Sequence, residues 1–363
     1  MAALQVTCVA GARPNFMKVA ALLEAFSKRP AFTSRLVHTG QHFSPEMSRV
    51  FFDELELPKP DAYLGIAGGS HAIQTAEVMK AIETDVTAHR PDLLVVVGDV
   101  NSTVASTLVA SKLHIPVAHV EAGLRSFDRA MPEELNRLVT DVLSDYLFVS
   151  EPSGVENLRA EGIPDERVFL VGNVMIDTLL RFRERAAEST ILRDLDLDVR
   201  GYTVVTLHRP SNVDDPAQLG RLLGVLRETA KQLKVVFPIH PRTKNVIDDA
   251  GLDSGALQCI PPVGYLDFLR LQSEARLVLT DSGGIQEETT ILGVPCLTVR
   301  ENTERPITID EGTNQLVGTD PTAISLAIDQ TLARPHPEPR APALWDGRAA
   351  ERIADELERL PAR

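Results

Sequence analysis

The sequence predicts an α/β protein with two domains, each built around its own parallel sheet. Short runs of β-branched and apolar residues alternate with longer helical patterns along the whole chain, which is typical of β–α units around a parallel sheet. The same alternation begins again in the second half, so two sheets in series explain it better than one. The chain has 363 residues, which exceeds the size at which a single hydrophobic core keeps growing.

Eleven strands are expected from these runs. They are the segments 4–10, 35–40, 92–98, 116–120, 145–150 and 167–172 in the first half, and 202–207, 234–240, 257–262, 276–281 and 294–299 in the second. We place the boundary near Asn173, where a strand that ends at Gly172 leads into an apolar helical segment. The proline-rich run 334–347 predicts an extended connector, because proline disrupts regular structure, and a final helix from about Ala349 to Leu360 follows it.

The composition argues against several classes of partner. The net charge of −14 and the isoelectric point near 5.2 disfavour binding to nucleic acid or to an anionic membrane, because a polyanion would be repelled. The three cysteines, Cys8, Cys259 and Cys296, lie far apart in apolar stretches, so we expect reduced core residues, with neither a disulfide framework nor a metal site. No apolar run approaches the roughly 20 residues of a membrane span and no signal segment is visible, so we expect a cytoplasmic protein.

Basic residues follow the first expected strand. Open parallel sheets bind ligands at the carboxyl ends of their strands, so polar residues at these positions are the best candidates for a site. Gly11 allows a tight turn there, Arg13 offers a guanidinium that can bind phosphate through two hydrogen bonds, and Lys18 adds a second positive charge. The alternative is that Arg13 and Lys18 form a solvated helix start, but their position after the strand favours the functional interpretation.

Carboxylates follow two further strands of the first half. Asp99 and Glu121 each come directly after an expected strand, and the segment PEELNR supplies Glu133, Glu134 and Arg137. Carboxylates that converge repel each other, which separates their pKa values and so distinguishes an acid from a base. Asp99 could instead cap the following helix. For Glu134 we favour an exposed helix start paired with Arg137, whereas Glu133 stays a candidate.

Two histidine–arginine pairs end consecutive strands of the second half. His208 and Arg209 end one strand, and His240 and Arg242 end the next, which indicates a binding role. A metal site at His208 and His240 is disfavoured, because no acidic or thiol partner lies at a zinc-ligand spacing. An isolated histidine is most often structural, so we assign no role to His38, His71, His89, His114 and His336.

The segment RLVLTDSGGIQEETTILGVPCLTV is a complete strand–turn–helix–strand unit. The run from Asp281 through Ser282, Gly283 and Gly284 would start its helix, where backbone N–H groups and the helix dipole favour a phosphate. The alternative is a tight turn whose glycines serve the backbone alone. One of the two glutamates that follow, Glu287 or Glu288, would reach a ribose or sugar hydroxyl. After the next strand, Arg305 would oppose the same phosphates.

Motifs for common cofactors are absent from the sequence. No G-x-G-x-x-G follows an expected strand, and no G-x-x-x-x-G-K-[ST] occurs. Bound NAD and ATP chemistry therefore lose support, and we expect neither a cofactor nor a metal.

The chain contains, in this order, the motifs GARPNFMK, TGQH, GDVNST, HVEAGLRS, PEELNR, LHRPSNVD, IHPRT, DSGGIQEE and TERP. Taken together, these motifs resemble those of the non-hydrolysing UDP-N-acetylglucosamine 2-epimerases. The resemblance covers about Val6 to Gly318. It implies a glycosyltransferase-B-like architecture, in which two Rossmann-like domains face a cleft and the C-terminal helix returns to the first domain. The implied domains are 1–172 with 346–363, and 173–345. The family interconverts UDP-GlcNAc and UDP-ManNAc by eliminating UDP and adding it back to a glycal, so the resemblance implies a UDP-sugar substrate and a homodimer.

The same resemblance assigns roles to individual residues. The carboxylates of the catalytic group would act as acid and base and His208 would steady the departing diphosphate; this group comprises Asp99, Glu121, Glu133, Arg137 and His208. Contacts to the nucleotide-sugar are implied for Arg13, Lys18, Ser282, Gly283, Gly284, Glu288 and Arg305, with Phe268 beside the uracil. We also expect Arg209 and His240 to bind the substrate, because they lie at the ends of expected strands.

Two positions depart from the family pattern. Ser44 stands where many bacterial members have a glutamine, which puts the family's allosteric substrate site in question, and Val263 stands at a uridine-side position that often holds glutamine. Three alternatives remain: a hydrolysing 2-epimerase that releases ManNAc and UDP, a glycosyltransferase of the same architecture, and a nucleotide-sugar binding module. The binding module is the weakest, because it has no need for so many strand-end carboxylates.

Overall fold

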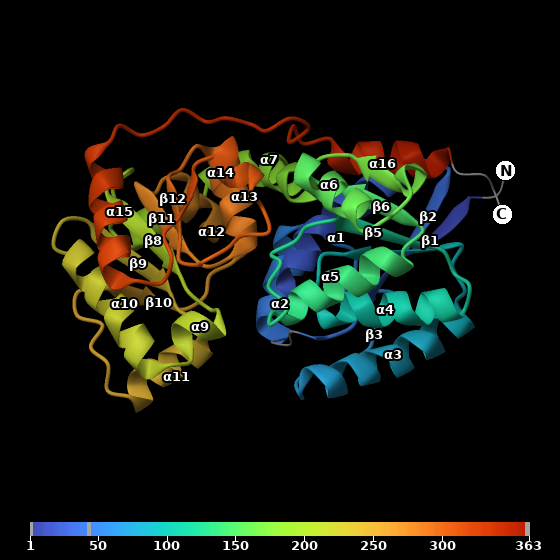
Figure 1. Ribbon diagram of the computed structural model, residues 1–363, viewed down its shortest axis with the longest axis horizontal. Coiled ribbons are helices and arrows are strands. Elements are labelled where there is room, and N and C mark those ends of the chain that lie inside the picture. Colours follow the sequence, from blue (N-terminus) through green and yellow to red (C-terminus); the bar gives the residue numbers. More distant parts are fainter. Residues whose placement is uncertain (1–2, 42–44, 360–363) are drawn as a thin grey trace. The chain divides into compact units, whose positions relative to one another are not determined.

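The computed structural model describes residues 3–41 and 45–359 (Figure 1). The chain divides into two compact units, Met1–Arg181 with Ala343–Arg363, and Phe182–Pro342. It passes from the first unit to the second within helix α7 (Val174–Ala187). The domain limits at 172 and 346 stay a prediction.

The first unit contains a seven-stranded sheet in the order β3-β2-β1-β4-β5-β6-β7, and every strand pairing in it is parallel. This order, which runs outward in both directions from β1, is that of a doubly wound Rossmann-like sheet. The strands are β1 (Leu4–Ala10), β2 (Phe32–His38), β3 (Ala62–Tyr63), β4 (Leu93–Val97), β5 (Val117–Ala122), β6 (Tyr146–Val149) and β7 (Val168–Leu170).

Helices cover this sheet in two layers. The helices α3, α4 and α5 pack side by side in one layer, whereas α1 packs against α16 and α2 in the other (Figure 1). The apolar residues of β4 are completely buried between them, as a central parallel strand requires. The bounds are α1 (Arg13–Ser27), α2 (Pro45–Glu54), α3 (His71–Ala88), α4 (Asn101–Lys112), α5 (Pro132–Leu143), α6 (Pro152–Ala160) and α16 (Ala349–Glu358).

The C-terminal segment belongs to the first unit, which confirms the expected return of the last helix. The carboxylate of Asp177 accepts the backbone N–H groups of Ala349 and Ala350 at 3.1 and 2.7 Å, and so caps the start of α16. Trp345 is almost completely buried, and its indole N–H donates to the carbonyl oxygen of Ser150 at 2.9 Å. These contacts fix the chain just before and at the beginning of α16.

The second unit contains a six-stranded parallel sheet in the order β10-β9-β8-β11-β12-β13. Its core includes apolar residues from β8, β9, β11 and β12 and from α10 and α15. The strands are β8 (Tyr202–Thr206), β9 (Lys234–Pro238), β10 (Gln258–Ile260), β11 (Leu277–Thr280), β12 (Cys296–Thr298) and β13 (Asn314–Leu316). The helices are α8 (Ile191–Asp194), α9 (Pro210–Val213), α10 (Pro216–Thr229), α11 (Pro241–Asp249), α12 (Tyr265–Ser273), α13 (Gly283–Leu292), α14 (Ile307–Asp310) and α15 (Pro321–Ala333).

The predicted α/β class with two parallel sheets is confirmed, and each of the eleven expected strands is present. The sequence missed β3 and β13, which have two and three residues and lie at sheet edges. The expectation that all three cysteines are core residues was wrong for Cys259, which is exposed because it lies on the edge strand β10. Among the described residues, no helix has the length and the apolar composition to cross a membrane.

Candidate functional site

The turn after β1 packs closely on the start of α4. A Cβ atom on Gly11 would lie 2.4 Å from Oγ of Ser102, so this position requires glycine for space. The side-chain oxygen of Asn15 accepts the N–H groups of Gly11 and Ala12 at 3.0 and 2.9 Å and fixes the turn. Arg13 is half-buried, and burial lowers the pKa of its guanidinium.

Glu121 has a backbone conformation that glutamate rarely adopts. Its φ angle is +73°, and the pairing of β5 with β6 shifts register between Val120 and Ala122, so Glu121 is the extra residue of a β-bulge. Its carboxylate forms a buried ion pair with Lys18 of α1. The alternative of a solvated helix start is therefore wrong for Lys18. Strained backbone at a buried charge is typical of functional sites.

Asp99 does not cap the helix that follows it. The N-cap of α4 is Val100, which makes no side-chain capping bond. The carboxylate of Asp99 instead accepts Nη1 of Arg137, whose side chain is almost completely buried. The other terminal nitrogen, Nη2, donates to Glu134 at 2.5 Å. Arg137 therefore fixes Asp99 relative to the first turns of α5.

Glu134 is buried, which corrects the expectation of an exposed helix start, although its pairing with Arg137 is confirmed. Its carboxylate accepts the backbone N–H groups of Ser126 and Phe127 at 2.9 and 3.0 Å, so it holds the loop that precedes α5. Burial alone would raise the pKa of Glu134. The hydrogen bonds from Arg137 and Ser126 together lower this pKa by a larger amount, so that it lies below its ordinary value. Glu133 is half-buried in the same helical turn.

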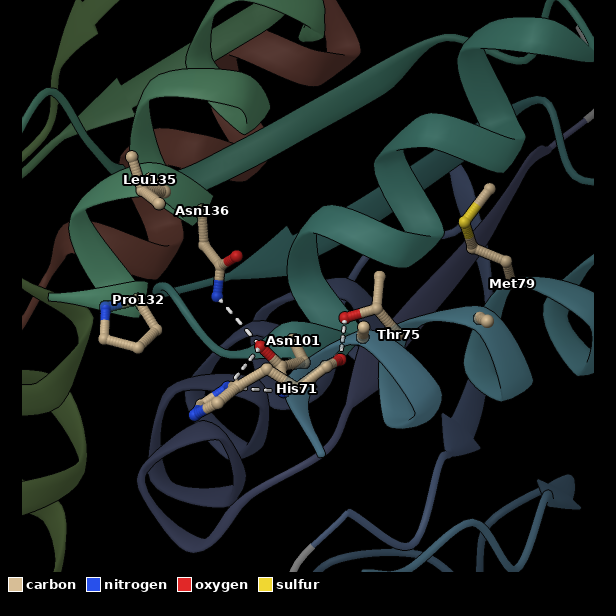
Figure 2. Close-up of a pocket in the computed structure, with 9 residues that line it drawn as sticks. His71, Thr75, Met79, Asn101, Pro132, Leu135 and Asn136 are labelled. Atoms are coloured by element: carbon tan, nitrogen blue, oxygen red, sulfur yellow. Dashed lines mark hydrogen bonds between the residues drawn. The ribbon is translucent and has the colours of Figure 1, made fainter. Parts of the chain in front are cut away.

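A pocket lies beside these groups, at the first turns of α3, α4 and α5 (Figure 2). The amide of Asn136 donates to the carbonyl oxygen of Asp99 at 2.9 Å and to Oδ1 of Asn101 at 3.3 Å. No role was expected for Asn136, although it lies inside PEELNR, or for His71. Ser44 lies outside the described residues. The pocket is lined by His71, Ala72, Thr75, Ala76, Met79, Asn101, Pro132, Leu135 and Asn136.

In the second unit, Asp281 holds the turn that carries His208. Its buried carboxylate accepts the backbone N–H groups of His208 and Arg209 at 3.0 and 2.9 Å, and Nδ2 of Asn212 at 3.0 Å. Nδ1 of His208 lies 2.8 Å from the same carboxylate. Burial raises the pKa of Asp281, but His208 and the other donors lower it below its ordinary value. The sequence placed Asp281 in the expected phosphate-binding turn. It did not indicate that Asp281 also holds His208.

Gly283 leaves room for a neighbouring arginine. A Cβ atom on Gly283, the first residue of α13, would lie 2.4 Å from Nη1 of Arg305. Arg305 is buried, and it donates to Glu287 at 2.8 Å and to Glu304 at 2.7 Å. The first turn of α13 thus combines the positive end of a helix with a buried guanidinium, which favours an anion. Ser282 is the N-cap residue of this helix and makes no side-chain capping bond.

Glu288 is buried further along α13, where its carboxylate accepts hydrogen bonds from Gln272 and, at 3.4 Å, from Tyr265. Burial raises the pKa of Glu288 to about 7. Phe268 of α12 is half-buried. His240 is exposed and caps α11, because its Nδ1 accepts the N–H of Arg242 at 3.2 Å. Within the described ranges, no three His, Cys, Asp or Glu side chains are grouped as metal ligands.

The family model for UDP-N-acetylglucosamine 2-epimerases matches residues 24–358. The chain belongs to the UDP-N-acetylglucosamine 2-epimerase family. This membership makes it an epimerase, and hence an isomerase. The matched residues lie in both units described above.

Relatives of this epimerase match it over nearly its full length. It is 40% identical to the UDP-N-acetylglucosamine 2-epimerase of Methanococcus maripaludis over 90% of this chain and 92% of that protein. It is also 40% identical to the UDP-2,3-diacetamido-2,3-dideoxy-D-glucuronate 2-epimerase of Pseudomonas aeruginosa, over 98% of this chain and all of the relative. The two relatives are thus equally similar to this chain and are named for different sugars.

Solved structures agree with the fold of the epimerase. The structure of the Methanocaldococcus jannaschii UDP-GlcNAc 2-epimerase in complex with UDP-GlcNAc and UDP has a TM-score of 0.91 at 40% identity, covering 98% of this chain and 99% of that one. A UDP-glucosyltransferase from Polygonum tinctorium has a TM-score of 0.61 at 17% identity, over 98% and 93% of the two chains, so its likeness concerns the fold alone. This likeness agrees with the glycosyltransferase-B-like architecture expected from the sequence.

Proposed function

We propose that this epimerase interconverts UDP-GlcNAc and UDP-ManNAc without releasing the free sugar. A base removes the C2 proton while the C1–O bond breaks, so that UDP leaves with the electron pair and a glycal remains. UDP then adds back to C1 while an acid delivers a proton to the opposite face of C2. Because C2 is next to no carbonyl group, the departing charge must be stabilised as the proton leaves.

The observation that carries the proposal is the pair of fixed carboxylates at the ends of β4 and β5. Asp99 is held by Arg137 and Glu121 by Lys18, and the positive φ angle gives Glu121 a conformation that only its surroundings can maintain. Two carboxylates in different environments suit an acid and a base. With Glu133 they form the proposed acid–base group, and Arg137 orients Asp99 within it.

The second unit carries the residues that we propose hold the diphosphate of the substrate. Ser282, Gly283 and Gly284 begin α13, where backbone N–H groups are available to phosphate oxygens. We propose that this turn, Arg305 and His208 stabilise the negative charge that grows on the leaving group. The other proposed contacts to the nucleotide-sugar are Arg13, Lys18, Arg209, His240, Phe268 and Glu288.

Incubation with UDP-GlcNAc in deuterium oxide, followed by NMR, tests this proposal. The expected products carry solvent deuterium at C2 and keep the link to UDP. Free ManNAc together with UDP would instead identify a hydrolysing 2-epimerase. The absence of C2 exchange would exclude epimerase chemistry on this sugar.

A second substrate is supported by the Pseudomonas aeruginosa relative. That relative is named for UDP-2,3-diacetamido-2,3-dideoxy-D-glucuronate and is 40% identical to this chain. The same experiment should therefore be run with both UDP-sugars, comparing kcat/KM for C2 exchange. A higher value for the diacetamido sugar would reassign the substrate while leaving the chemistry unchanged.

We also propose that the chain forms a homodimer through α5 and the neighbouring α3. The amphipathicity of α5 is inverted: its buried side carries Glu134, Arg137, Thr140 and Asp141. Its outer side is apolar, with Leu135, Val139 and Val142 exposed and Leu138 half-buried. On α3, Ile73 is 60% exposed. An exposed apolar side of a helix, such as that of α5, is typical of a protein interface, and a second copy is the simplest partner.

A further proposal concerns the cellular location of the enzyme. The cysteines among the described residues are all free thiols, which suits a reducing compartment such as the cytoplasm. A cytoplasmic location therefore stays our proposal.

A further inference from the structure

His119 lies inside β5 with both of its ring nitrogens hydrogen-bonded and with no exposed surface. Nδ1 is 2.6 Å from Oδ1 of Asp141, and Nε2 is 2.8 Å from the carbonyl oxygen of Gly98. Neither partner was connected to His119 by the sequence motifs. His119 therefore joins α5 to the segment that follows β4, a role beyond packing in the core.

The partners of His119 determine which protons the ring carries. The carbonyl oxygen of Gly98 only accepts hydrogen bonds, so Nε2 must donate. The other oxygen of Asp141 pairs with the guanidinium of Arg125 at 2.7 Å, so the carboxylate is ionised and also only accepts. Both nitrogens therefore carry protons, and the ring is an imidazolium ion.

The surrounding charges balance this buried cation. Asp141 lies between His119 and Arg125, whose Nη2 is 2.7 Å from Oδ2 of Asp141. Arg125 in turn pairs with Glu161 at 2.6 Å. Two cations thus alternate with two anions, and a paired buried charge of this kind is tolerated where an isolated one is not. Lys18, which lies near Gly98, is balanced by Glu121.

The His119–Asp141 pair connects the three segments that carry the proposed acid–base group. Gly98, which accepts from His119, directly precedes Asp99. The second oxygen of Asp141 accepts the N–H of Gly123 at 3.1 Å, two residues after Glu121. Asp141 itself lies on α5, which begins with the turn that carries Glu133. One ion pair therefore fixes the ends of β4 and β5 to α5.

We propose that His119 is a positioning residue, which as an imidazolium bound to Asp141 holds Asp99 and Glu121 in place for proton transfer. This proposal rests on the proposed function, because those two carboxylates are its acid and base. Gly98 and Glu121 have φ angles of +64° and +73°. For Glu121 this conformation is costly, so it persists only where neighbouring contacts enforce it. The pair supplies such contacts from completely buried positions.

The variant His119→Gln tests the positioning role, because its amide nitrogen can take the place of only one of the two ring nitrogens and carries no charge. We expect kcat for C2 exchange to fall about 100-fold, since a misplacement of about 1 Å costs this much, while KM and the Kd of UDP stay unchanged. Asp141→Asn removes the charge while keeping the shape and should act in the same direction. His89→Gln, at an exposed histidine, is the matched control and should leave kcat unchanged.

Imidazole ¹⁵N NMR of the wild-type chain tests the charge state and needs no variant to fold. The expected signal has two slowly exchanging N–H groups on one ring, one for each of the two acceptors. A neutral ring for His119, or a wild-type kcat in His119→Gln, would overturn the positioning role alone. No C2 exchange in the wild-type chain would overturn the proposed function and this role with it.

Discussion

His208 and Asp281 form a hydrogen-bonded pair, in which Nδ1 of the imidazole lies 2.8 Å from Oδ1 of the carboxylate. Asp281 is completely buried, whereas the His208 side chain is 56% exposed. The carboxylate also accepts the backbone N–H groups of His208 and Arg209. It therefore fixes both the turn and the ring, and leaves Nε2 as the nitrogen available to a ligand.

We expect Asp281→Asn to reduce the rate of C2 exchange about 10- to 100-fold, the usual effect of removing the group that orients a functional imidazole. His208→Ala should slow exchange as well, and the double variant should be little slower than the worse single one, because the two residues act as a unit. Asp320→Asn is the matched control, since Asp320 caps α15 through Ala323 and has no proposed role. Strictly additive effects of the two substitutions would contradict the coupling.

The second prediction concerns Asp99, whose carboxylate is held by Arg137. Asp99→Asn keeps the size of the side chain but cannot transfer a proton, so C2 exchange should be abolished while UDP binding, measured by calorimetry, is retained. Asp248→Asn, in an exposed pair with Lys244, should behave as the wild-type chain. Measurable turnover in Asp99→Asn would remove Asp99 from the acid–base group.

The sequence predicted where the candidate residues lie along the chain, because strand ends can be read from local patterns. It did not predict their pairing, which depends on strand order. His208 and Asp281 meet because β8 and β11 are neighbours in the sheet, although β9 and β10 come between them in the sequence. Lys18 and Glu121 are 103 residues apart and meet across β4.

Backbone conformation was a second source of missed information. Nothing in the letters HVEAGLR indicates that Glu121 sits in a bulge with a positive φ angle. Gly283 was expected to allow the approach of a phosphate, and its missing side chain also makes room for Arg305, which the sequence did not indicate. Local pattern therefore identified these residues but not every physical reason for them.

The third prediction follows from this packing. Gly283→Ala would place a methyl group 2.4 Å from Nη1 of Arg305, so the guanidinium must move away from Glu287 and Glu304. We expect a loss of about 1–3 kcal/mol in the free energy of unfolding, as for overpacking, together with weaker UDP binding. Gly224→Ala is the matched control, because a Cβ atom there meets open space in α10. Unchanged UDP affinity in Gly283→Ala would show that Arg305 does not contribute to the proposed phosphate site.

The fourth prediction uses the raised pKa of Glu288. The value in the folded chain is about 7, against 4.5 for the ordinary group, and burial is the main cause. The protonated carboxyl therefore contributes stability that is fully present below about pH 4.5 and is lost as the pH rises through about 7. Glu288→Gln mimics the protonated form and should not lose it.

Calorimetric unfolding of wild-type and Glu288→Gln chains between pH 5 and pH 8 measures this difference. The stability of the variant relative to the wild-type chain should increase with pH by up to about 3 kcal/mol, at 1.36 kcal/mol for each pKa unit. Glu228→Gln, at an exposed glutamate of α10, should give an offset that does not change with pH. A pH-independent difference for Glu288→Gln would show that this carboxyl is ionised throughout the range.

The fifth prediction concerns the apolar outer side of α5. Val139 is 39% exposed on this helix, between Leu135 and Val142. Val139→Glu would place a charge in the proposed interface, where burying it without a partner is costly, so the dimer should dissociate. Light scattering after size exclusion should give a dimer for the wild-type chain and the monomer mass of 39.7 kDa for the variant.

Leu326→Glu distinguishes the proposed interface from a general effect of added charge, because Leu326 is 57% exposed but lies on α15 of the second unit. This control should remain dimeric. Dissociation should also affect the reaction, because α5 carries Glu133 and Asn136, and Asn136 donates to the backbone of Asp99. C2 exchange per chain should therefore fall when the wild-type protein is diluted below the Kd of the dimer. A monomeric wild-type chain, or a dimer that survives Val139→Glu, would contradict the assignment of this surface.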